Sequence, residues 1–305
     1  MEQPKANRIQ KAIGKRFRKI ITNSPDGTPP WLKEVGQGED AGLFLPSDAP
    51  WVVHGDLATL IGGIRALLMQ ALHPGTLSGV ATHSRYEQDP LGRLAGTTKW
   101  LTVTTFGSLS AIDSEAGRVN KMHGAVKGNY KNAQGEKVSY QASDFELLLW
   151  VHIAFTASFL KAHQLYSKKP IPGGADSYVS LWSKSVTRLG LEKCPMNEQQ
   201  LNNAIKNFYD SKQLLANETT LKVIKFLKNP PLPKVAKIIY TLLFQAAAAS
   251  IEKEYLELLK IKALPLWFVR PITHSLLWAM AKAIGSESPL ETAAKNRLVR
   301  IGAWS

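Results

Sequence analysis

The sequence predicts an all-α protein, and three observations carry this prediction. Apolar residues recur every three or four positions in long successive windows, which is the period of a helix with one buried face. Prolines and glycines stand between these windows, where they end helices and favour turns. No segment alternates apolar and polar residues with comparable strength, so we expect helices packed on helices rather than a sheet.

The N-terminal segment predicts a basic amphipathic helix. Seven lysines and arginines between residues 5 and 19 interleave with apolar residues at helical spacing, namely Ile9, Ile13, Phe17 and Ile20. Two interpretations stay open: the helix lies on an anionic lipid surface, or it docks its apolar stripe on the rest of the domain. Residues 28–50 are rich in proline and glycine, and we expect an arm that leads into the domain.

Three helices are then expected, at 56–72, at about 89–107 and at about 113–127. Pro74 and Gly75 should end the first, because proline has no backbone N–H and clashes with the preceding turn. Ser110 or Asp113 can cap the third helix.

A hairpin-like excursion over 129–140 is predicted by its turn-rich centre, Asn-Ala-Gln-Gly-Glu. Residues 145–166 form a strongly apolar helix that we expect to be deeply buried, and further helical windows follow at 176–190, 197–215, 217–228, 234–262, 265–284 and 287–300. The windows 235–251 and 264–284 are apolar enough to need a membrane check. Because both windows carry basic residues, we expect core helices rather than membrane-spanning ones.

Composition narrows the class of protein. The chain has 305 residues, 44% of them hydrophobic and 20% charged, as in an ordinary globular protein. The single cysteine, Cys194, excludes a disulfide within the chain and a cysteine-rich metal site. The net charge of +14 suggests an anionic partner. No nucleic-acid-binding signature accompanies this charge, so we expect that the protein does not bind nucleic acid. The polar, basic N-terminus lacks the apolar core of a signal peptide and predicts a cytoplasmic protein.

Histidine is the residue type best placed to carry chemistry. None of the seven histidines forms the His-Glu-x-x-His zinc pattern, and hydrolase, Walker and dinucleotide motifs are absent from the sequence. Haem iron needs only an axial ligand from the protein, so one helical histidine can serve it. The histidines are therefore compatible with a haem-binding site, but they do not by themselves establish one.

A series of motifs between residues 67 and 152 resembles the catalytic domain of the MpaB/rubber-oxygenase family. It comprises Leu-Leu-Met-Gln-Ala-Leu-His-Pro at 67–74, His-Ser-Arg-Tyr at 83–86, Asp-Pro at 89–90, Arg93-Leu94, Thr97, Phe-Gly at 106–107, Val119, Met-His-Gly-Ala-Val-Lys-Gly at 122–128, Tyr140, Asp144 and Leu-Leu-Trp-Val-His at 148–152. Order and spacing agree over roughly residues 50–165, and the helical remainder to about 285 is compatible. The resemblance implies a globin-like helical core that holds haem b. It divides the chain into a basic arm at 1–49, a haem domain at 50–285 and a C-terminal tail at 286–305.

The resemblance also implies roles for individual residues. His123 matches the proximal haem ligand, where a neutral imidazole would bind iron. Arg93 and Thr97, four residues apart on one helical face, match residues that line the distal pocket and could hydrogen-bond dioxygen or a haem propionate. His73 and His152 also match family positions and are expected to line the pocket or to hydrogen-bond in the core. Gly96 stands where the family's rubber oxygenases carry lysine.

The expected function is therefore a haem-dependent oxygenase that binds dioxygen at iron and oxidises or cleaves an apolar, isoprenoid-like substrate. Two alternatives stay open. One is a haem-binding sensor, carrier or peroxidase-like protein, which the absent lysine favours. The other is a haem-free helical domain that binds lipid, with an anionic membrane contact through residues 1–22.

Overall fold

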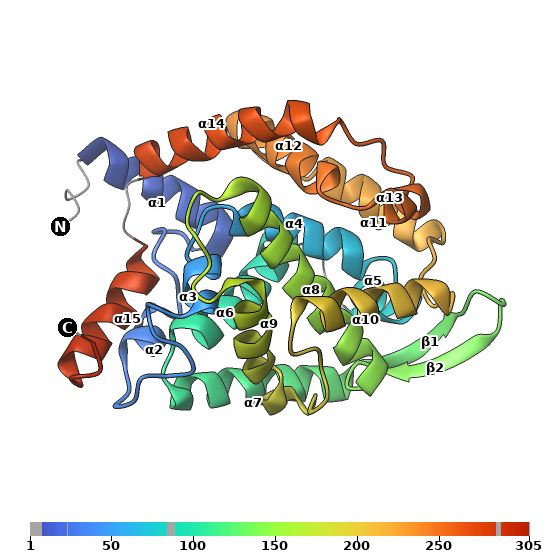
Figure 1. Cartoon of the computed structure of the whole chain (residues 1–305), viewed down its shortest axis with the longest axis horizontal. Helices are drawn as coiled ribbons and strands as arrows, with labels where there is room; N and C mark the ends of the chain where they lie inside the picture. Colours follow the sequence, from blue (N-terminus) through green and yellow to red (C-terminus); the bar gives the residue numbers. More distant parts are fainter. Residues whose placement is uncertain (1–7, 23, 84–88, 285–287, 305) are drawn as a thin grey trace.

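The computed structural model describes residues 8–22, 24–83, 89–284 and 288–304. Fifteen α-helices and one two-stranded hairpin make up this part of the chain, which confirms the all-α class. Figure 1 follows the elements from the N-terminus to the C-terminus. The first half comprises α1 (Arg8–Thr22), α2 (Leu32–Gly36), α3 (Ala49–His54), α4 (Thr59–Gln70), α5 (Pro74–His83), α6 (Pro90–Phe106), α7 (Leu109–Ala125), β1 (Lys127–Lys131) and β2 (Lys137–Gln141). The second half comprises α8 (Phe145–Tyr166), α9 (Gly174–Trp182), α10 (Glu198–Asp210), α11 (Glu218–Lys228), α12 (Lys234–Ala249), α13 (Lys253–Leu259), α14 (Leu266–Ile284) and α15 (Pro289–Arg300).

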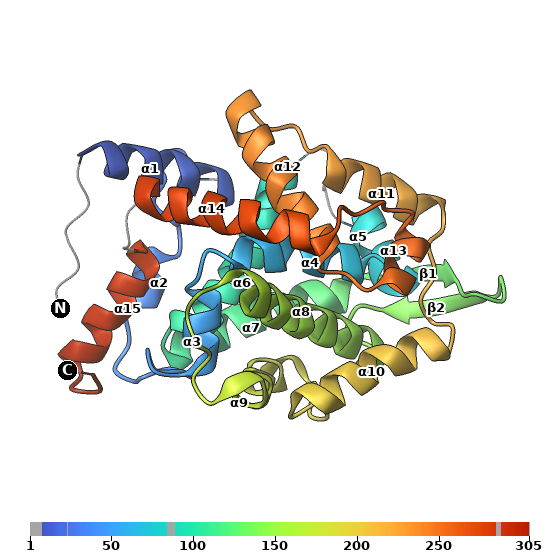
Figure 2. The same ribbon diagram turned by 45° about the horizontal axis from the view of Figure 1, so that its top comes forward.

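The centre of the molecule is the pair α4 and α8, which pack along each other. The remaining helices surround this pair, and the hairpin projects at one end (Figure 2). Helix α8 is long and apolar enough to cross a membrane, but 61% of its most apolar stretch is buried inside the protein. It is a core helix, as predicted.

The main core forms around α4 and α8, from side chains such as Leu68, Trp150 and Phe159. A second, smaller core joins α2, α3, α6 and α15, and its centre includes Trp31, Trp51 and Leu298. Helix α6 lies between the two cores, since Leu101 packs on the first and Val103 belongs to the second. The division of the chain at residues 49 and 285 stays a prediction, but α1 packs on α6 and α14, and α15 packs on α2 and α6.

Several helix boundaries differ from those predicted. Helix α4 already ends at Gln70, and Pro74 instead begins α5, because the N–H that proline lacks is not needed at the first position of a helix. Helix α7 starts earlier than expected: Ser108, not Ser110 or Asp113, is its N-cap and accepts from the backbone N–H of Ala111. The hairpin forms as predicted, with Asn129 opposite Ser139.

The window 234–262 was expected to be one helix but is divided into α12 and α13. Buried Arg65 explains the break. Its guanidinium donates to the Ser250 carbonyl at 3.4 Å and to the Glu252 carboxylate at 2.9 Å, and both acceptors lie in the interruption. A continuous helix would engage that carbonyl in its own hydrogen bonds, so the interruption satisfies a cation taken out of water.

Helix α1 packs on α6 and α14, and Phe17 lies partly buried against the main core. This basic helix therefore docks on the rest of the domain, and its contact with lipid stays a prediction. Its first predicted residues, 5–7, lie outside the described part of the chain.

Candidate functional site

His123 lies near the C-terminal end of α7, three residues before the backbone turns into β1. Its Nδ1 is buried, and no hydrogen-bond partner for it exists among the described residues. Burial lowers the pKa of the imidazole, and the nearby Arg118 guanidinium lowers it further. The ring is therefore neutral, with a lone pair available for a metal or a donor.

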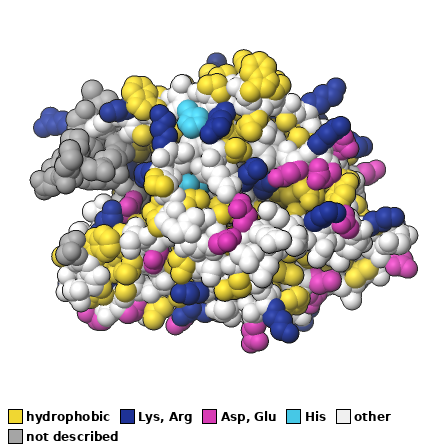
Figure 3. All heavy atoms as spheres, in the orientation of Figure 1, with side chains coloured by type: hydrophobic (Ala, Val, Ile, Leu, Met, Phe, Trp, Pro, Cys, Tyr) yellow, Lys and Arg dark blue, Asp and Glu magenta, His cyan; other side chains and the backbone are white. Residues whose placement is uncertain are grey.

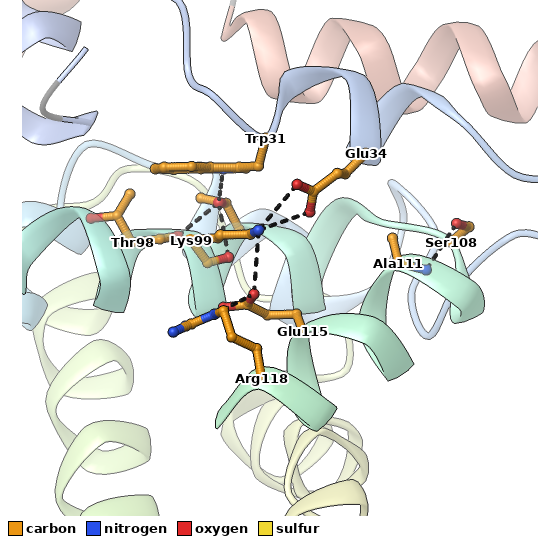
Figure 4. Close-up of polar contacts among 9 residues, drawn as sticks. Trp31, Glu34, Thr98, Lys99, Ser108, Ala111, Glu115 and Arg118 are labelled. Atoms are coloured by element: carbon orange, nitrogen blue, oxygen red, sulfur yellow. Dashed lines mark hydrogen bonds and ion pairs between the residues drawn. The ribbon is translucent and has the colours of Figure 1, made fainter. Parts of the chain in front are cut away.

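A network of charged residues braces the helix that carries His123 (Figure 4). Glu115 is buried, and its carboxylate accepts from the Arg118 guanidinium at 2.8 and 2.6 Å. The Lys99 ammonium of α6 bridges Glu115 at 3.5 Å to Glu34 of α2 at 3.0 Å. These contacts tie α7 to two other helices and place a fixed positive charge close to His123.

Helix α6, which packs directly on α7, carries the two distal residues implied by the family resemblance. The Arg93 side chain lies outside the described part of the structure. Thr97 is half-buried and stands one helical turn before Leu101, whose side chain packs on the main core. Thr97 therefore lies on the side of α6 that faces that core.

Thr104 continues this side of α6 and was not predicted as a site residue. Its side chain is fully buried, and its hydroxyl has no partner among the described residues. The neighbouring Thr102 and Thr105 hydroxyls instead donate to backbone carbonyls of the preceding turn, each at 2.7 Å. The seven-residue separation from Thr97 could have pointed to Thr104, because i and i+7 share a helical face.

His152 contributes from α8. It is 4% exposed, its Nε2 is buried without a partner in the described structure, and burial lowers its pKa to about 4. Leu148 and Phe155, one turn away on either side, are only half-buried. The surroundings of this neutral ring along α8 are thus mainly apolar.

His73 has a structural contact instead. Its Nδ1 accepts from the backbone N–H of Gly75 at 3.1 Å, which places the proton on Nε2 and helps to begin α5. Burial lowers its pKa to about 4, and its ring packs near Tyr130, Trp150 and Phe208. This is the core hydrogen bond expected for His73, and it engages one of the two nitrogens that could bind a metal.

His54 shows how a fully satisfied histidine differs from His123. Thr105 donates to the Leu101 carbonyl and so accepts from His54 Nδ1 at 2.8 Å, while the Tyr178 hydroxyl donates to Nε2 at 3.0 Å. Burial lowers the pKa of His54 to about 3. Both nitrogens are occupied, and the residue serves packing.

A cavity of 380 Å³ lies elsewhere, between α4, α8, α10 and α13. Arg65, Lys161, Tyr209 and Glu252 are among its lining residues, and none of the predicted site residues borders it. The unpartnered polar atoms of His123, Thr104 and His152 do not border this cavity, and the Arg65 guanidinium, which does, is hydrogen-bonded to Glu252 and Ser158. Within the described ranges, no three His, Cys, Asp or Glu side chains group to hold a metal ion.

Comparison with known proteins identifies the family of the chain. Residues 51–285 match the family described as ER-bound oxygenase mpaB/B′/rubber oxygenase, catalytic domain. The chain belongs to the MpaB/rubber-oxygenase family. This MpaB-family domain is thereby an oxygenase domain, an oxidoreductase acting on a small molecule with dioxygen. No curated protein and no solved structure matches the chain.

Proposed function

We propose that the protein is a haem b-dependent oxygenase in which His123 would hold the haem iron. The observation that carries this proposal is the buried Nδ1 of His123, which is neutral and has no partner among the described residues. Buried polar atoms are nearly always hydrogen-bonded, so an exception at a family motif points to a ligand. One axial nitrogen is also all that haem requires of the protein.

Haem iron, when bound, would supply the dioxygen chemistry. The chain would supply the environment. His123 would donate a lone pair from a helix held in place by Glu115 and Lys99. Arg93 and Thr97 would donate hydrogen bonds on the distal side, and the unpartnered Thr104 hydroxyl and His152 Nε2 are further groups that could bind or orient a ligand.

The substrate we propose is apolar and isoprenoid-like, with an oxidised or cleaved double bond as one outcome. The half-buried Leu148 and Phe155 beside His152 favour an apolar ligand, since their exposed area would be removed from water on binding. The family description includes rubber oxygenases, which is consistent with this class.

A second candidate is a haem-binding protein without oxygenase turnover. Gly96 favours it, because the resembling enzymes place a lysine before the distal threonine. Product formation with dioxygen and a reductant would separate the two. We further propose that the protein is cytoplasmic and that residues 1–22 contact an anionic membrane.

The first test is an absorption spectrum of the protein expressed with sufficient haem. We expect a Soret band at about one haem per chain, and we expect His123→Ala to lose it while keeping its helical circular dichroism. Added free imidazole should restore the band in the variant if the ring is a ligand. His274→Ala is the matched control, because His274 already has a partner in the Leu165 carbonyl at 3.2 Å, and it should keep the band. Unchanged haem binding in His123→Ala would remove the assignment.

The distal residues have a separate test. Arg93→Ala and Thr97→Ala should keep haem but weaken dioxygen binding by about tenfold, because each removes a donor to the bound ligand. Stopped-flow measurement of dioxygen dissociation from the ferrous protein checks this. Dissociation rates equal to those of the parent protein would assign both residues to structural roles.

A further inference from the structure

Helix α14 is apolar on both of its sides. Its inner side is buried through Val269, Thr273, Leu277 and Met280. Its outer side nevertheless carries Trp267, Phe268, Ile272 and Trp278, which are 78%, 46%, 40% and 63% exposed. A surface helix in water normally turns polar residues outward, so this outer side has a composition that favours contact with an apolar phase.

Helix α12 packs on α14 and extends the same surface. Val235, Ile238 and Leu242 follow one another at helical spacing, and the first two are 72% and 66% exposed. We call these three residues, together with the four outer residues of α14, the α12–α14 face. Along the upper edge of Figure 3, hydrophobic side chains alternate with lysine and arginine.

The three helices that form or adjoin the α12–α14 face carry charges of one sign. Helices α1, α12 and α14 contain ten lysines and arginines and no aspartate or glutamate. Helix α1 packs on α14, and Gln10 donates to the Lys282 carbonyl at 2.8 Å. The basic residues thus flank the exposed aromatic residues on one region of the molecule.

We propose that the α12–α14 face, with α1 beside it, docks on the surface of an anionic lipid bilayer. Tryptophan favours the boundary between water and acyl chains, and lysine and arginine beside it bind anionic headgroups. Helix α14 lies flat rather than crossing, because its inner side is packed on the protein and it contains Arg270 and Lys282. A two-fold dimer through this face would place α1, α12 and α14 of one copy against the same helices of the other. These helices are basic and contain no aspartate or glutamate, so repulsion between like charges disfavours such a dimer.

Vesicle flotation with the full chain tests the proposal without depending on haem. The protein should float with vesicles of phosphatidylcholine and phosphatidylserine, bind vesicles of phosphatidylcholine alone less well, and be released by added salt. The double variant Trp267→Ser/Trp278→Ser should lower the ratio of bound to free protein by at least about tenfold, since both indoles would no longer leave water. Lys237→Glu/Lys282→Glu should lower it by about tenfold or more on the anionic vesicles.

Matched variants separate docking from general effects. Trp304→Ser removes an exposed indole at the C-terminal end, and Lys131→Glu/Lys137→Glu reverses two charges on the hairpin; both should bind vesicles like the parent. Circular dichroism verifies that every variant is folded. No flotation of the parent, or flotation that the double tryptophan variant leaves unchanged, would overturn the proposal. A dimer in light scattering that this variant dissociates would assign the face to a second copy instead.

Discussion

At the scale of single residues, unoccupied hydrogen-bonding capacity separates His123 and His152 from His54 and His73. His54 and His73 are both buried and neutral, but each makes hydrogen bonds that hold helices together. His123 and His152 are neutral for the same reason and leave a buried nitrogen unpartnered within the described chain. Such an atom lowers stability by about 1–3 kcal/mol, which a bound ligand would recover.

Gly96 gives a prediction at this scale. No atom lies within 4 Å of the position that a Cβ would take there, so Gly96→Ala should stabilise α6 by roughly 0.5–1 kcal/mol through helix propensity. Gly62→Ala is the matched change on α4, where the Cβ would lie 2.6 Å from a Phe159 ring atom and 3.0 Å from its backbone. We expect it to destabilise the fold by about 1–3 kcal/mol. Thermal unfolding measures both, and a loss of stability in Gly96→Ala would show that α6 needs glycine there.

At the scale of elements, α7 is held against α6 and α2 by charges rather than by apolar packing alone. Glu115 is the central residue, because Arg118 and Lys99 both contact its buried carboxylate. The family motif that includes His123 contains none of the residues of this network. Its members come from three helices, and local spacing alone does not bring Glu34, Lys99 and Glu115 together.

We therefore predict that Glu115→Gln lowers the free energy of unfolding by about 1.5–2 kcal/mol, since it weakens hydrogen bonds from two cations to a buried carboxylate, while both cations keep access to water. Urea unfolding followed by circular dichroism checks this value. Glu257→Gln removes an exposed partner of Lys253 and should change stability by no more than about 0.5 kcal/mol. Equal effects of the two changes would mean that the buried network contributes no more than a surface ion pair.

The boundaries of elements show where local signals were sufficient. The apolar period predicted α8 to its exact ends, and turn-rich residues predicted the hairpin. The division between α12 and α13 was missed, because its cause, the cation of Arg65, lies far away in sequence and in the main core. The outer sides of α12 and α14 were predicted to be buried and are exposed, since apolarity alone does not state what covers a helix.

At the scale of the whole molecule, stability should fall in acid because three buried histidines are neutral in the folded state. Burial lowers the pKa of His54 to about 3, and of His73 and His152 to about 4, from 6.5. A lowered pKa means that the unfolded chain binds more protons. The stabilisation is complete above about pH 6.5 and is lost as the pH falls toward about 4, at about 1.4 kcal/mol per pH unit for each histidine.

Urea titrations between about pH 7.5 and about pH 4.5 would measure this slope. His152→Leu removes one of these groups, so its slope should be smaller than that of the parent by up to about 1.4 kcal/mol per pH unit. A slope identical to that of the parent would show that His152 is not neutral in the folded state. Overall charge repulsion is nearly the same in both proteins and cancels in the comparison.

Local sequence was enough to predict the longer helices, the hairpin and the family motifs, because helical period and turn propensity act over a few residues, but it missed α2, α3 and α5. The positions of His123, Thr97 and His152 on their helices followed from the same rule. The tertiary structure alone determined that Thr104 has no partner, that Glu115 is buried between two cations, and that α14 exposes its indoles. Burial and hydrogen bonding of a given atom depend on residues that are distant in the chain, and those contacts form only when the helices pack.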